Sequence, residues 1–463
     1  MTAEIFTRRT LLPAPPEAVF RWHTRPGALE RLMPPWLRMC VLERQGGIRD
    51  GGRVRLRLFK GPFHFDWDVE HFGYVENRQF CDRQIRGPFA HWEHRHFFEP
   101  EGAAACFVED RIEYRLPMGA AGRLAAGRAV RRELERMFIY RHRVLQQDVA
   151  ACLGHRIHPR MNILVTGSSG LIGSALRPFL ETCHHQVARL TRMSRQSGPA
   201  TARAWDPEKG AFPTAALEGF DAVIHLAGEN IAARRWTRKE KELIRNSRIK
   251  GTRHLCEALA RLDRPPKVLI AASATGYYGD RGAEMLDEDS APGAGFLPAV
   301  CREWEEATAP AAGRGIRVVN LRFGVVLTPA GGALASMLPA FRAGLGGPMG
   351  SGWQFMSWVA MDDVIGAVQH ALLTESLRGP VNVVSPQPVS NRDFSRVLGR
   401  VLNRPAFFRM PAFALKILLG EMAGPLLLAG ARVQPRRLLE TGYAFRYPDL
   451  EDALRHLLGR EPA

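Results

Sequence analysis

Residues 1–156 combine a strand-type alternation with a helix-type repeat. Arg53–Leu58 alternates strictly between arginine and apolar side chains, which is the period of a half-buried strand. Phe63–Phe72 and His91–Phe98 are rich in aromatic residues and also favour strands. Ala120–Val149 repeats apolar residues four apart, as one face of a long helix does. Several antiparallel strands followed by a long helix predict an α+β domain.

From Met161 onward, short apolar runs alternate with amphipathic segments. The expected strands are Asn162–Val165, Gln186–Leu190, Asp221–Leu226, Lys267–Ala272 and Arg317–Phe323. Long helices are expected between them, at Thr237–Leu262 and Phe296–Ala312. Such alternation predicts an α/β fold of the Rossmann type, a doubly wound parallel sheet with helices on both faces. After about residue 385 the pattern becomes helical and loop-like, and it ends in a helix that starts at Pro448-Asp449.

The first turn of this second part carries three evenly spaced glycines. Gly167, Gly170 and Gly173 stand between the strand that begins at Asn162 and an amphipathic segment. In a dinucleotide-binding turn the first glycine permits the tight bend, the second admits the pyrophosphate, and the third lets helix and strand pack closely. The new helix directs free N–H groups at the phosphates. Because the glycines lie between a strand and a helix, we interpret them as a dinucleotide site.

Length, charge and cysteine usage narrow the class of protein. A chain of 463 residues predicts two or three domains. The net charge of +17 comes mostly from arginines spread along the chain, without a basic block, so we do not expect a nucleic-acid partner. The apolar run Pro411–Val433 is broken by Lys416, Glu421 and Pro425, which argues against a membrane span. Seven scattered cysteines and a start without an apolar core suggest reduced thiols in the cytoplasm.

Three histidines invite a metal interpretation. On a strand, His94 and His96 share one face and His91 points to the other. Two histidines without a third ligand do not make a closed site. We therefore expect a solvated strand face and no metal.

The first 156 residues resemble the START-like superfamily of polyketide cyclase-type helix-grip domains. The resemblance rests on element order, with PPEAVFRWH early, DRIEYRLP late and then the terminal helix. It implies a curved sheet that grips a helix around a cavity for an apolar ligand. Aromatic residues that could line such a cavity, or simply form core, are Trp22, Trp36, Phe63, Phe65, Trp67, Trp92, Phe97 and Phe98. The polar stretch Gly154–Arg160 is then expected to be a linker to a fused second protein that begins at Met161.

The rest of the chain resembles the extended short-chain dehydrogenases/reductases. TGSSGLIG at Thr166 matches their T-G-x-x-G-x-x-G turn, DAVIHLAG at Asp221 their fourth strand, and SATGYYG at Ser273 their S-x-x-x-Y-G segment. GENIAARRWT, SRIKGTRHL, LRFGVVLTPAGGAL and GLGGPMGSGWQFMSWV point to an atypical epimerase/dehydratase-like subgroup, sometimes labelled cell-division inhibitors. The resemblance implies a Rossmann domain at 161–385 and a C-terminal cap at 386–463. It also implies a cofactor site formed by Gly167, Ser168, Ser169, Gly170, Leu171, Ile172, Gly173, Leu226, Ala227, Gly228 and Ser273.

Ordinary members of this family use a tyrosine as acid and base, with a lysine four residues later. When the chain is lined up on Glu305, these positions hold Leu297 and Cys301, and neither can do that proton chemistry. The remaining catalytic candidates are Ser273, Tyr277 and Tyr278. Two functions stay open. One is an NADP(H)-dependent oxidoreductase or epimerase on an unidentified small carbonyl or sugar-like substrate, and the other is a non-catalytic protein that binds NADP(H) and a lipid-like ligand.

The second strand of the Rossmann domain indicates which cofactor is bound. NAD-binding turns usually place an acidic residue at its end, to hold the ribose hydroxyls. Here the strand ends in Leu190-Thr-Arg192, with Arg195 close behind and no acidic residue. An arginine can hold a 2′-phosphate through paired, charge-assisted hydrogen bonds. The alternative is that these arginines belong to an exposed basic loop that binds no phosphate. We therefore expect NADP(H) rather than NAD(H). The sequence does not predict the oligomeric state.

Overall fold

The computed structural model describes residues 3–154, 160–192, 202–206, 210 and 217–460. By its internal contacts the chain divides into two compact units. Unit 1 comprises Met1–Pro159, Glu181–His184 and His456–Ala463, and unit 2 comprises Arg160–Leu180 and His185–Arg455.

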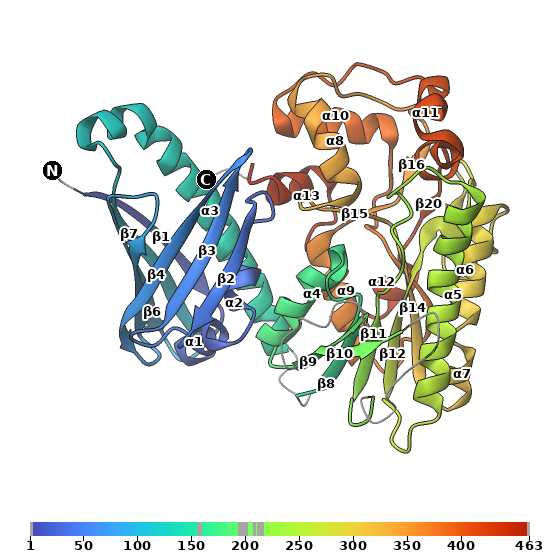
Figure 1. The fold of residues 1–463 in the computed structure, drawn as a ribbon, viewed down its shortest axis with the longest axis horizontal. Coiled ribbons are helices and arrows are strands. Elements are labelled where there is room, and N and C mark those ends of the chain that lie inside the picture. The colour runs from blue at the N-terminus through green and yellow to red at the C-terminus, as the bar shows by residue number, and fades with distance from the viewer. Residues whose placement is uncertain (1–2, 155–159, 193–201, 207–209, 211–216, 461–463) are drawn as a thin grey trace. The chain divides into compact units, whose positions relative to one another are not determined.

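Unit 1 is an antiparallel sheet with one long helix, as the strand and helix patterns predict. Its strands pair in the order β1-β7-β6-β5-β4-β3-β2, and Figure 1 shows the long helix α3 running along this sheet. The strands are β1 (Glu4–Leu12), β2 (Met39–Gln45), β3 (Arg53–Lys60), β4 (Phe63–Val75), β5 (Gln79–Arg86), β6 (His91–Glu101) and β7 (Ala105–Arg115). The helices are α1 (Pro16–Thr24), α2 (Ala28–Arg31) and α3 (Gly119–Gly154).

The aromatic residues of unit 1 divide between core and surface. Trp22, Trp92 and Phe98 are buried among apolar residues of the sheet and α3. Phe63 and Phe65 instead lie at the exposed start of β4, with 75% and 36% of their surface accessible. The cavity for an apolar ligand stays a prediction.

The prediction of a solvated strand face for His94 and His96 is wrong. Both residues lie on the inner face of β6 and are 3–4% exposed. Burial of these polar rings is tolerated because Asp82 of β5 and Asp110 of β7 stand directly across the sheet from them. The two-residue period of a strand correctly places His94 and His96 on one face, but it does not show that carboxylates share that face.

The expectation that all cysteines are reduced is also wrong. Cys152, near the end of α3, forms a disulfide with Cys183, with 5.0 Å between their Cα atoms. Both cysteines belong to unit 1. The remaining cysteines are free thiols at positions 40, 81, 106, 256 and 301. Sequence spacing cannot reveal a pair that is 31 residues apart and is brought together only by the fold.

Unit 2 is the predicted doubly wound parallel sheet. Its order is β10-β9-β8-β11-β12-β14-β18, and every neighbouring pair is parallel. The strands are β8 (Asn162–Thr166), β9 (Gln186–Arg192), β10 (Ala202–Trp205), β11 (Ala222–His225), β12 (Val268–Ala274), β14 (Arg317–Phe323) and β18 (Gly379–Val383). The sheet is built from nearly continuous buried apolar runs, as parallel strands covered on both faces should be.

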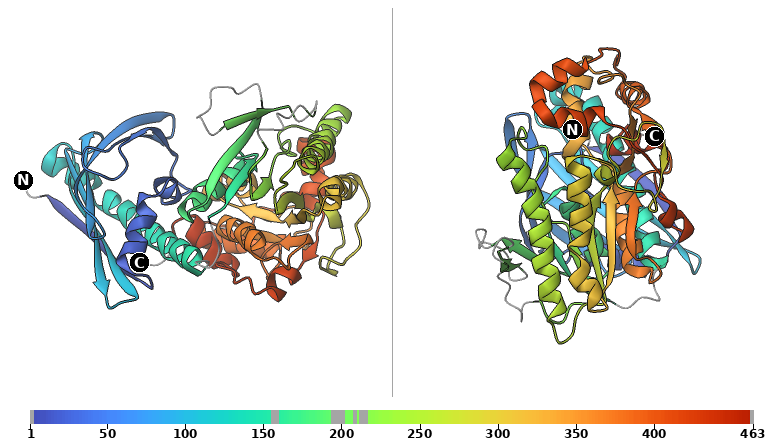
Figure 2. Two further views of the ribbon diagram at one scale, coloured as in Figure 1. Left: turned by 90° about the horizontal axis from the view of Figure 1, so that it is seen from below. Right: turned by 90° about the vertical axis from the view of Figure 1, so that its right-hand side faces the viewer.

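Helices cover both faces of this sheet, as Figures 1 and 2 show. On one face lie α5 (Arg238–Ala260), α6 (Phe296–Glu306) and α7 (Ala309–Gly313), and on the other α4 (Leu171–Thr182) and α9 (Met361–Leu373). The single helix expected at Phe296–Ala312 is therefore divided into α6 and α7. Pro310 lacks the N–H that would continue the helical hydrogen bonds.

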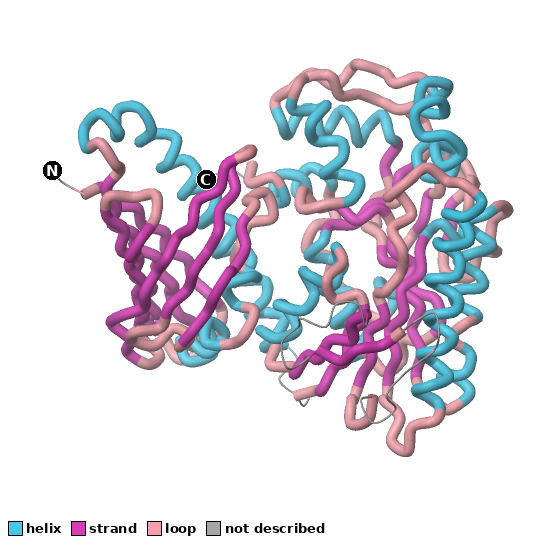
Figure 3. Tube along the Cα trace, viewed as in Figure 1, coloured by secondary structure: helices cyan, strands magenta, loops and turns pink. Residues whose placement is uncertain are grey.

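Outside the parallel sheet, the chain from β13 onward adds short strands and small helices, which appear in the secondary-structure colouring of Figure 3. The strands are β13 (Met285–Leu286), β15 (Val325–Leu327), β16 (Phe355–Met356), β17 (Trp358–Ala360), β19 (Val389–Ser390) and β20 (Arg432–Val433). The helices are α8 (Gly332–Arg342), α10 (Asn391–Leu402), α11 (Ala412–Leu419), α12 (Arg436–Glu440) and α13 (Leu450–Leu457). Among the described residues, no helix is both long and apolar enough to cross a bilayer.

Candidate functional site

The glycine turn lies between β8 and α4, at the point where the strand order reverses. Gly167 has a φ of 67°, and a Cβ there would come within 2.7 Å of the backbone of Leu226. A Cβ on Gly173 would lie 2.3 Å from the carbonyl oxygen of Gly167. These two positions therefore exclude any side chain. A glycine turn outside the carboxyl ends of β8 and β11 is where an open α/β sheet binds a dinucleotide.

A buried hydrogen-bond network fixes the strand ends beneath this turn. Thr166 Oγ1 lies 2.7 Å from His225 Nδ1 and accepts a hydrogen bond from the N–H of Ala227. His225 Nε2 lies 3.0 Å from Thr252 Oγ1 of α5, which also accepts from the indole of Trp304. Burial lowers the pKa of His225 to about 4, so the ring is neutral at physiological pH. The network links β8, β11 and two helices into a rigid base for the turn.

The other predicted cofactor positions surround the turn. Ser169, Gly170 and Gly228 are exposed, and Ser168 and Gly173 are buried. The half-buried positions between these two extremes are Leu171, Ile172, Leu226 and Ala227. The exposed members give the turn an open side from which a nucleotide can approach.

Arg192 ends β9, where its backbone pairs with Trp205 of β10. This is the strand end that the sequence assigns to the 2′-phosphate. The Arg192 side chain and the whole of Arg195 lie outside the described residues.

Ser273 stands near the carboxyl end of β12 and is engaged by a carboxylate. Its hydroxyl donates to Glu305 Oε1 of α6 at 2.7 Å, and the side chain is buried. Arg322 of β14 holds the same carboxylate through two hydrogen bonds of 2.8 Å. Because the Ser273 hydroxyl donates its hydrogen bond to Glu305, it must change partners before it can donate to a substrate oxygen.

The two tyrosines occupy different environments in the short 3-10 helix Thr275–Tyr278. Tyr278 is fully buried, its oxygen lies 2.8 Å from both the Asp287 carbonyl and Asn382 Oδ1, and it accepts from Arg322. Burial raises the pKa of Tyr278 to about 12. Tyr277 is half-buried, and the Arg322 guanidinium lies 3.5 Å from its ring centroid. Tyr278 is therefore held as a neutral phenol within the packing of the site.

Leu297 and Cys301 of α6 lie beside this 3-10 helix. A Cβ on Gly276 would stand 3.6 Å from Leu297 Cβ and 3.7 Å from Cys301 Sγ. Burial and the nearby Glu305 raise the pKa of the Cys301 thiol to about 12. Neither side chain supplies a proton-transfer group or a fixed positive charge at neutral pH.

Arg322 is a residue of the site that the sequence motifs do not reveal. Its signal is a charged residue between the apolar side chains of Leu321 and Phe323, near the end of a strand that is buried from Val318 onward. Such a residue is rarely buried without a partner. The pattern therefore indicates a paired arginine, although it does not show that Glu305 is the partner.

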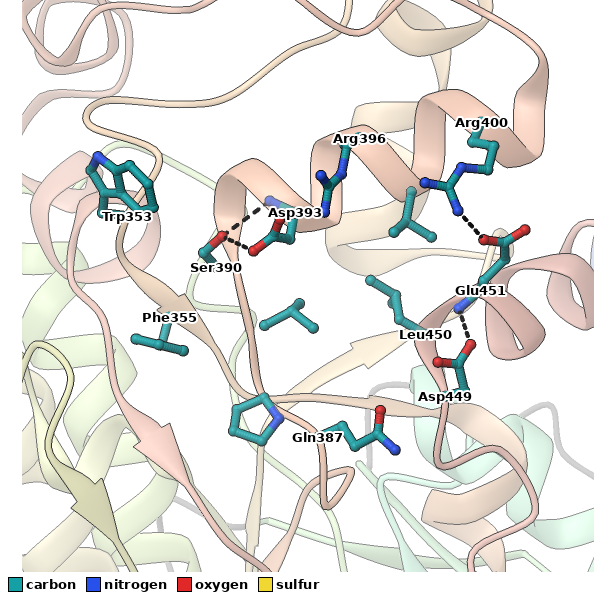
Figure 4. Close-up of a pocket in the computed structure, with 13 residues that line it drawn as sticks. Trp353, Phe355, Gln387, Ser390, Asp393, Arg396, Arg400, Asp449, Leu450 and Glu451 are labelled. Atoms are coloured by element: carbon teal, nitrogen blue, oxygen red, sulfur yellow. Dashed lines mark hydrogen bonds and ion pairs between the residues drawn. The ribbon is translucent and has the colours of Figure 1, made fainter.

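Unit 2 also contains a pocket of about 490 Å³, which includes none of the predicted site residues. Figure 4 shows apolar side chains, with Trp353 and Phe355 among them, facing charged ones. Several of these charges are paired. Arg400 donates to Glu451, and Asp449 accepts from the backbone N–H of Glu451 at the start of α13. The lining of the pocket therefore combines apolar side chains with paired charges.

Three family models match the chain. The NAD dependent epimerase/dehydratase family matches residues 163–384. Polyketide cyclase / dehydrase and lipid transport matches residues 12–139, and a domain of unknown function, DUF1731, matches residues 410–457. These matches fall in the order expected from the two resemblances.

Comparison with individual proteins points to the same epimerase family. An epimerase family protein of Mycobacterium bovis is 43% identical over 300 residues, which cover 64% of this chain and 98% of the relative. A crystal structure of the nucleoside-diphosphate sugar epimerase from Corynebacterium glutamicum covers 98% of this chain and 90% of its own, with 33% identity and a TM-score of 0.81. The structure of human epimerase family protein SDR39U1 with NADPH covers 64% of this chain and 99% of its own, with 36% identity and a TM-score of 0.60.

Proposed function

The chain belongs to the NAD-dependent epimerase/dehydratase family, and from this premise we propose that its main function is to bind NADP(H) at the glycine turn after β8. The observation that carries the proposal is the turn itself, where Gly167 and Gly173 leave room only for backbone. Binding of an NAD(P) cofactor follows from the family. The choice of NADP(H) is supported by the basic end of β9 at Arg192 and by the human relative, whose structure contains NADPH.

The side chains near the carboxyl end of β12 are expected to allow only slow catalytic turnover. When bound, the nicotinamide would supply hydride transfer, and this chain would have to supply the proton and orient the substrate. Leu297 cannot transfer a proton, and the Cys301 thiol stays protonated because its pKa is about 12. Well-placed acid/base groups contribute about 10²–10⁴-fold to rate, so their loss removes a large part of ordinary catalysis. Tyr277 and Ser273 remain as candidates for orienting a small carbonyl or sugar-like substrate.

The alternative is a non-catalytic protein that binds NADP(H) in unit 2 and a lipid-like ligand in unit 1. Leu297 and Cys301 favour this alternative, and the Ser273 hydroxyl favours retained chemistry. The family match of residues 12–139 to polyketide cyclases and lipid transport proteins is consistent with an apolar ligand. A cytoplasmic location and the absence of a nucleic-acid partner stay predictions.

An NADPH oxidation assay across a broad panel of carbonyl compounds and nucleotide sugars separates these functions. We expect rates well below those of ordinary dehydrogenases with every substrate. Any residual rate should fall in the variants Ser273→Ala, Tyr277→Phe or Tyr278→Phe. Turnover at ordinary enzyme rates that survives all three substitutions would mean that the chemistry lies on other residues.

A further inference from the structure

A cluster of buried histidines and carboxylates lies inside unit 1, apart from the nucleotide site. Asp82 of β5, His94 and His96 of β6, and Asp110 of β7 occupy the inner face of the sheet. His142 of α3 joins them from the helix side. None of these residues has a role in the function proposed above. Ionisable groups are rarely buried together without a reason, because each carboxylate needs a compensating charge.

Asp82 lies at metal-binding spacing from both His94 and His96. Asp82 Oδ2 lies 3.3 Å from His94 Nδ1 and 3.6 Å from His96 Nε2. One ligand atom from each of the three residues lies within 4.8 Å of the others. Zinc bonds of about 2.0–2.2 Å at tetrahedral angles place ligand atoms roughly 3.3–3.6 Å apart. The separations involving Asp82 therefore match those between two ligands of one ion.

The opposite nitrogen of each ring is directed at Asp110. His94 Nε2 lies 2.8 Å from Asp110 Oδ1, and His96 Nδ1 lies 2.6 Å from the same oxygen. Metal-bound histidines usually contact a carboxylate through their second nitrogen, which fixes the ring orientation. Asp110 is in turn held by His142 Nε2 at 2.6 Å from Oδ2, and His142 Nδ1 lies 2.8 Å from Thr10 Oγ1.

We propose that Asp82, His94 and His96 bind one divalent transition-metal ion of the zinc type, with Asp110 orienting both histidines. Two histidines and one carboxylate leave at least one coordination position for water or another ligand. Asp82 is the most accessible of the three ligands, with 15% of its side chain exposed against 4–5% for the histidines. The ion can therefore enter from the Asp82 side. A dication also compensates the charge of two buried carboxylates, which otherwise rely on the histidines and on Arg141 of α3.

The test uses the full-length, untagged protein, stripped with a chelator and titrated with Zn²⁺ by calorimetry. We expect one tightly bound Zn²⁺ per chain. Asp82→Asn and His96→Gln should each weaken binding at least a hundredfold. Asp110→Asn should keep the stoichiometry and weaken binding about 10–100-fold, which is the usual effect of losing an orienting partner.

The matched control is His64→Gln, on the exposed part of β4, which should leave Zn²⁺ binding unchanged. Far-UV circular dichroism shows whether each variant is folded. If Asp82→Asn does not fold, the wild-type stoichiometry and His96→Gln decide the result. The proposal is overturned if the wild-type protein binds no Zn²⁺ tightly, or if folded Asp82→Asn or His96→Gln binds it as the wild type does.

Discussion

Arg322 joins most of the polar side chains at the carboxyl ends of β12 and β14. It donates twice to Glu305 and once to the Tyr278 oxygen, and it stacks on Tyr277. Ser273 reaches the same network through Glu305. The three catalytic candidates are thus joined through Arg322 and Glu305. The sequence reveals Ser273, Tyr277 and Tyr278 through their motif, but it cannot show that an arginine 44 residues beyond Tyr278 holds them.

Removal of one hydroxyl should reveal whether Tyr278 is structural. Tyr278→Phe leaves Arg322 and Asn382 each without one hydrogen bond, which should cost about 1–3 kcal/mol of folding stability. Because the folded state raises the pKa of Tyr278 from 10 to about 12, its stabilisation is complete below pH 10 and is lost as pH rises toward 12. Denaturant unfolding at pH 7 and pH 11 measures both effects.

The control for this variant is Tyr74→Phe, because the Tyr74 hydroxyl makes no hydrogen bond among the described residues. Its unfolding free energy should change little. Equal stability of Tyr278→Phe and the wild type at pH 7 would argue against a structural role for the Tyr278 hydroxyl.

Arg192 should determine the preference for NADP(H) over NAD(H). Loss of a charge-assisted pair to the 2′-phosphate costs about 1.5–3 kcal/mol, so Arg192→Ala should weaken NADPH binding roughly tenfold to a hundredfold. NADH binding should be almost unaffected, because NADH has no 2′-phosphate. Fluorescence titration of both nucleotides checks this, with the exposed Arg238→Ala on α5 as control. An equal loss of affinity for both nucleotides would contradict the assignment.

The sequence predicts the secondary-structure elements around the site more accurately than it predicts the contacts of single residues. The spans of the parallel strands follow from their apolar runs, and β14 has the predicted bounds Arg317–Phe323. The sequence does not predict the short strands β16, β19 and β20, because a segment of two residues carries no periodicity. These strands gain their hydrogen bonds from distant partners, and only the fold brings those together.

Close packing of the turn onto α4 is testable at Gly173. A Cβ there would meet the Gly167 carbonyl and Ser168 Cα, so Gly173→Ala must displace the turn. We expect NADPH binding to fall at least tenfold, with a stability loss of about 1–3 kcal/mol, as overpacking usually causes. Gly313→Ala at the end of α7 is the control, because nothing lies within 4 Å of its added Cβ. Unchanged NADPH affinity in Gly173→Ala would show that the nucleotide does not depend on this turn.

The sequence predicts that the whole molecule has two parts, but it does not show which distant residues belong to unit 1. Unit 1 includes residues from the end of the chain, where Arg136 of α3 donates to the carbonyls of Leu458 and Gly459. His456 stacks on Tyr140 at 4.8 Å between ring centroids. These contacts join positions more than 300 residues apart, which no local pattern can reveal.

Residues 1–156 should nevertheless fold as an isolated fragment. Their two main apolar clusters are formed entirely by residues before 154. The fragment should be less stable than the intact unit, because it lacks the Cys152–Cys183 disulfide and the contacts from His456 onward. We expect a cooperative thermal transition and saturable binding of a hydrophobic fluorescent probe. An unfolded fragment, or a folded one without saturable binding, would remove the support for an apolar-ligand domain.

Both functions considered for unit 2 require that the chain binds NADP(H). Calorimetric titration of the full-length protein with NADPH, and with NADH under the same conditions, tests it most directly. We expect one NADPH per chain, bound at least tenfold more tightly than NADH. Absence of NADPH binding would contradict the proposed function, and equal affinity for the two nucleotides would contradict the assignment of Arg192.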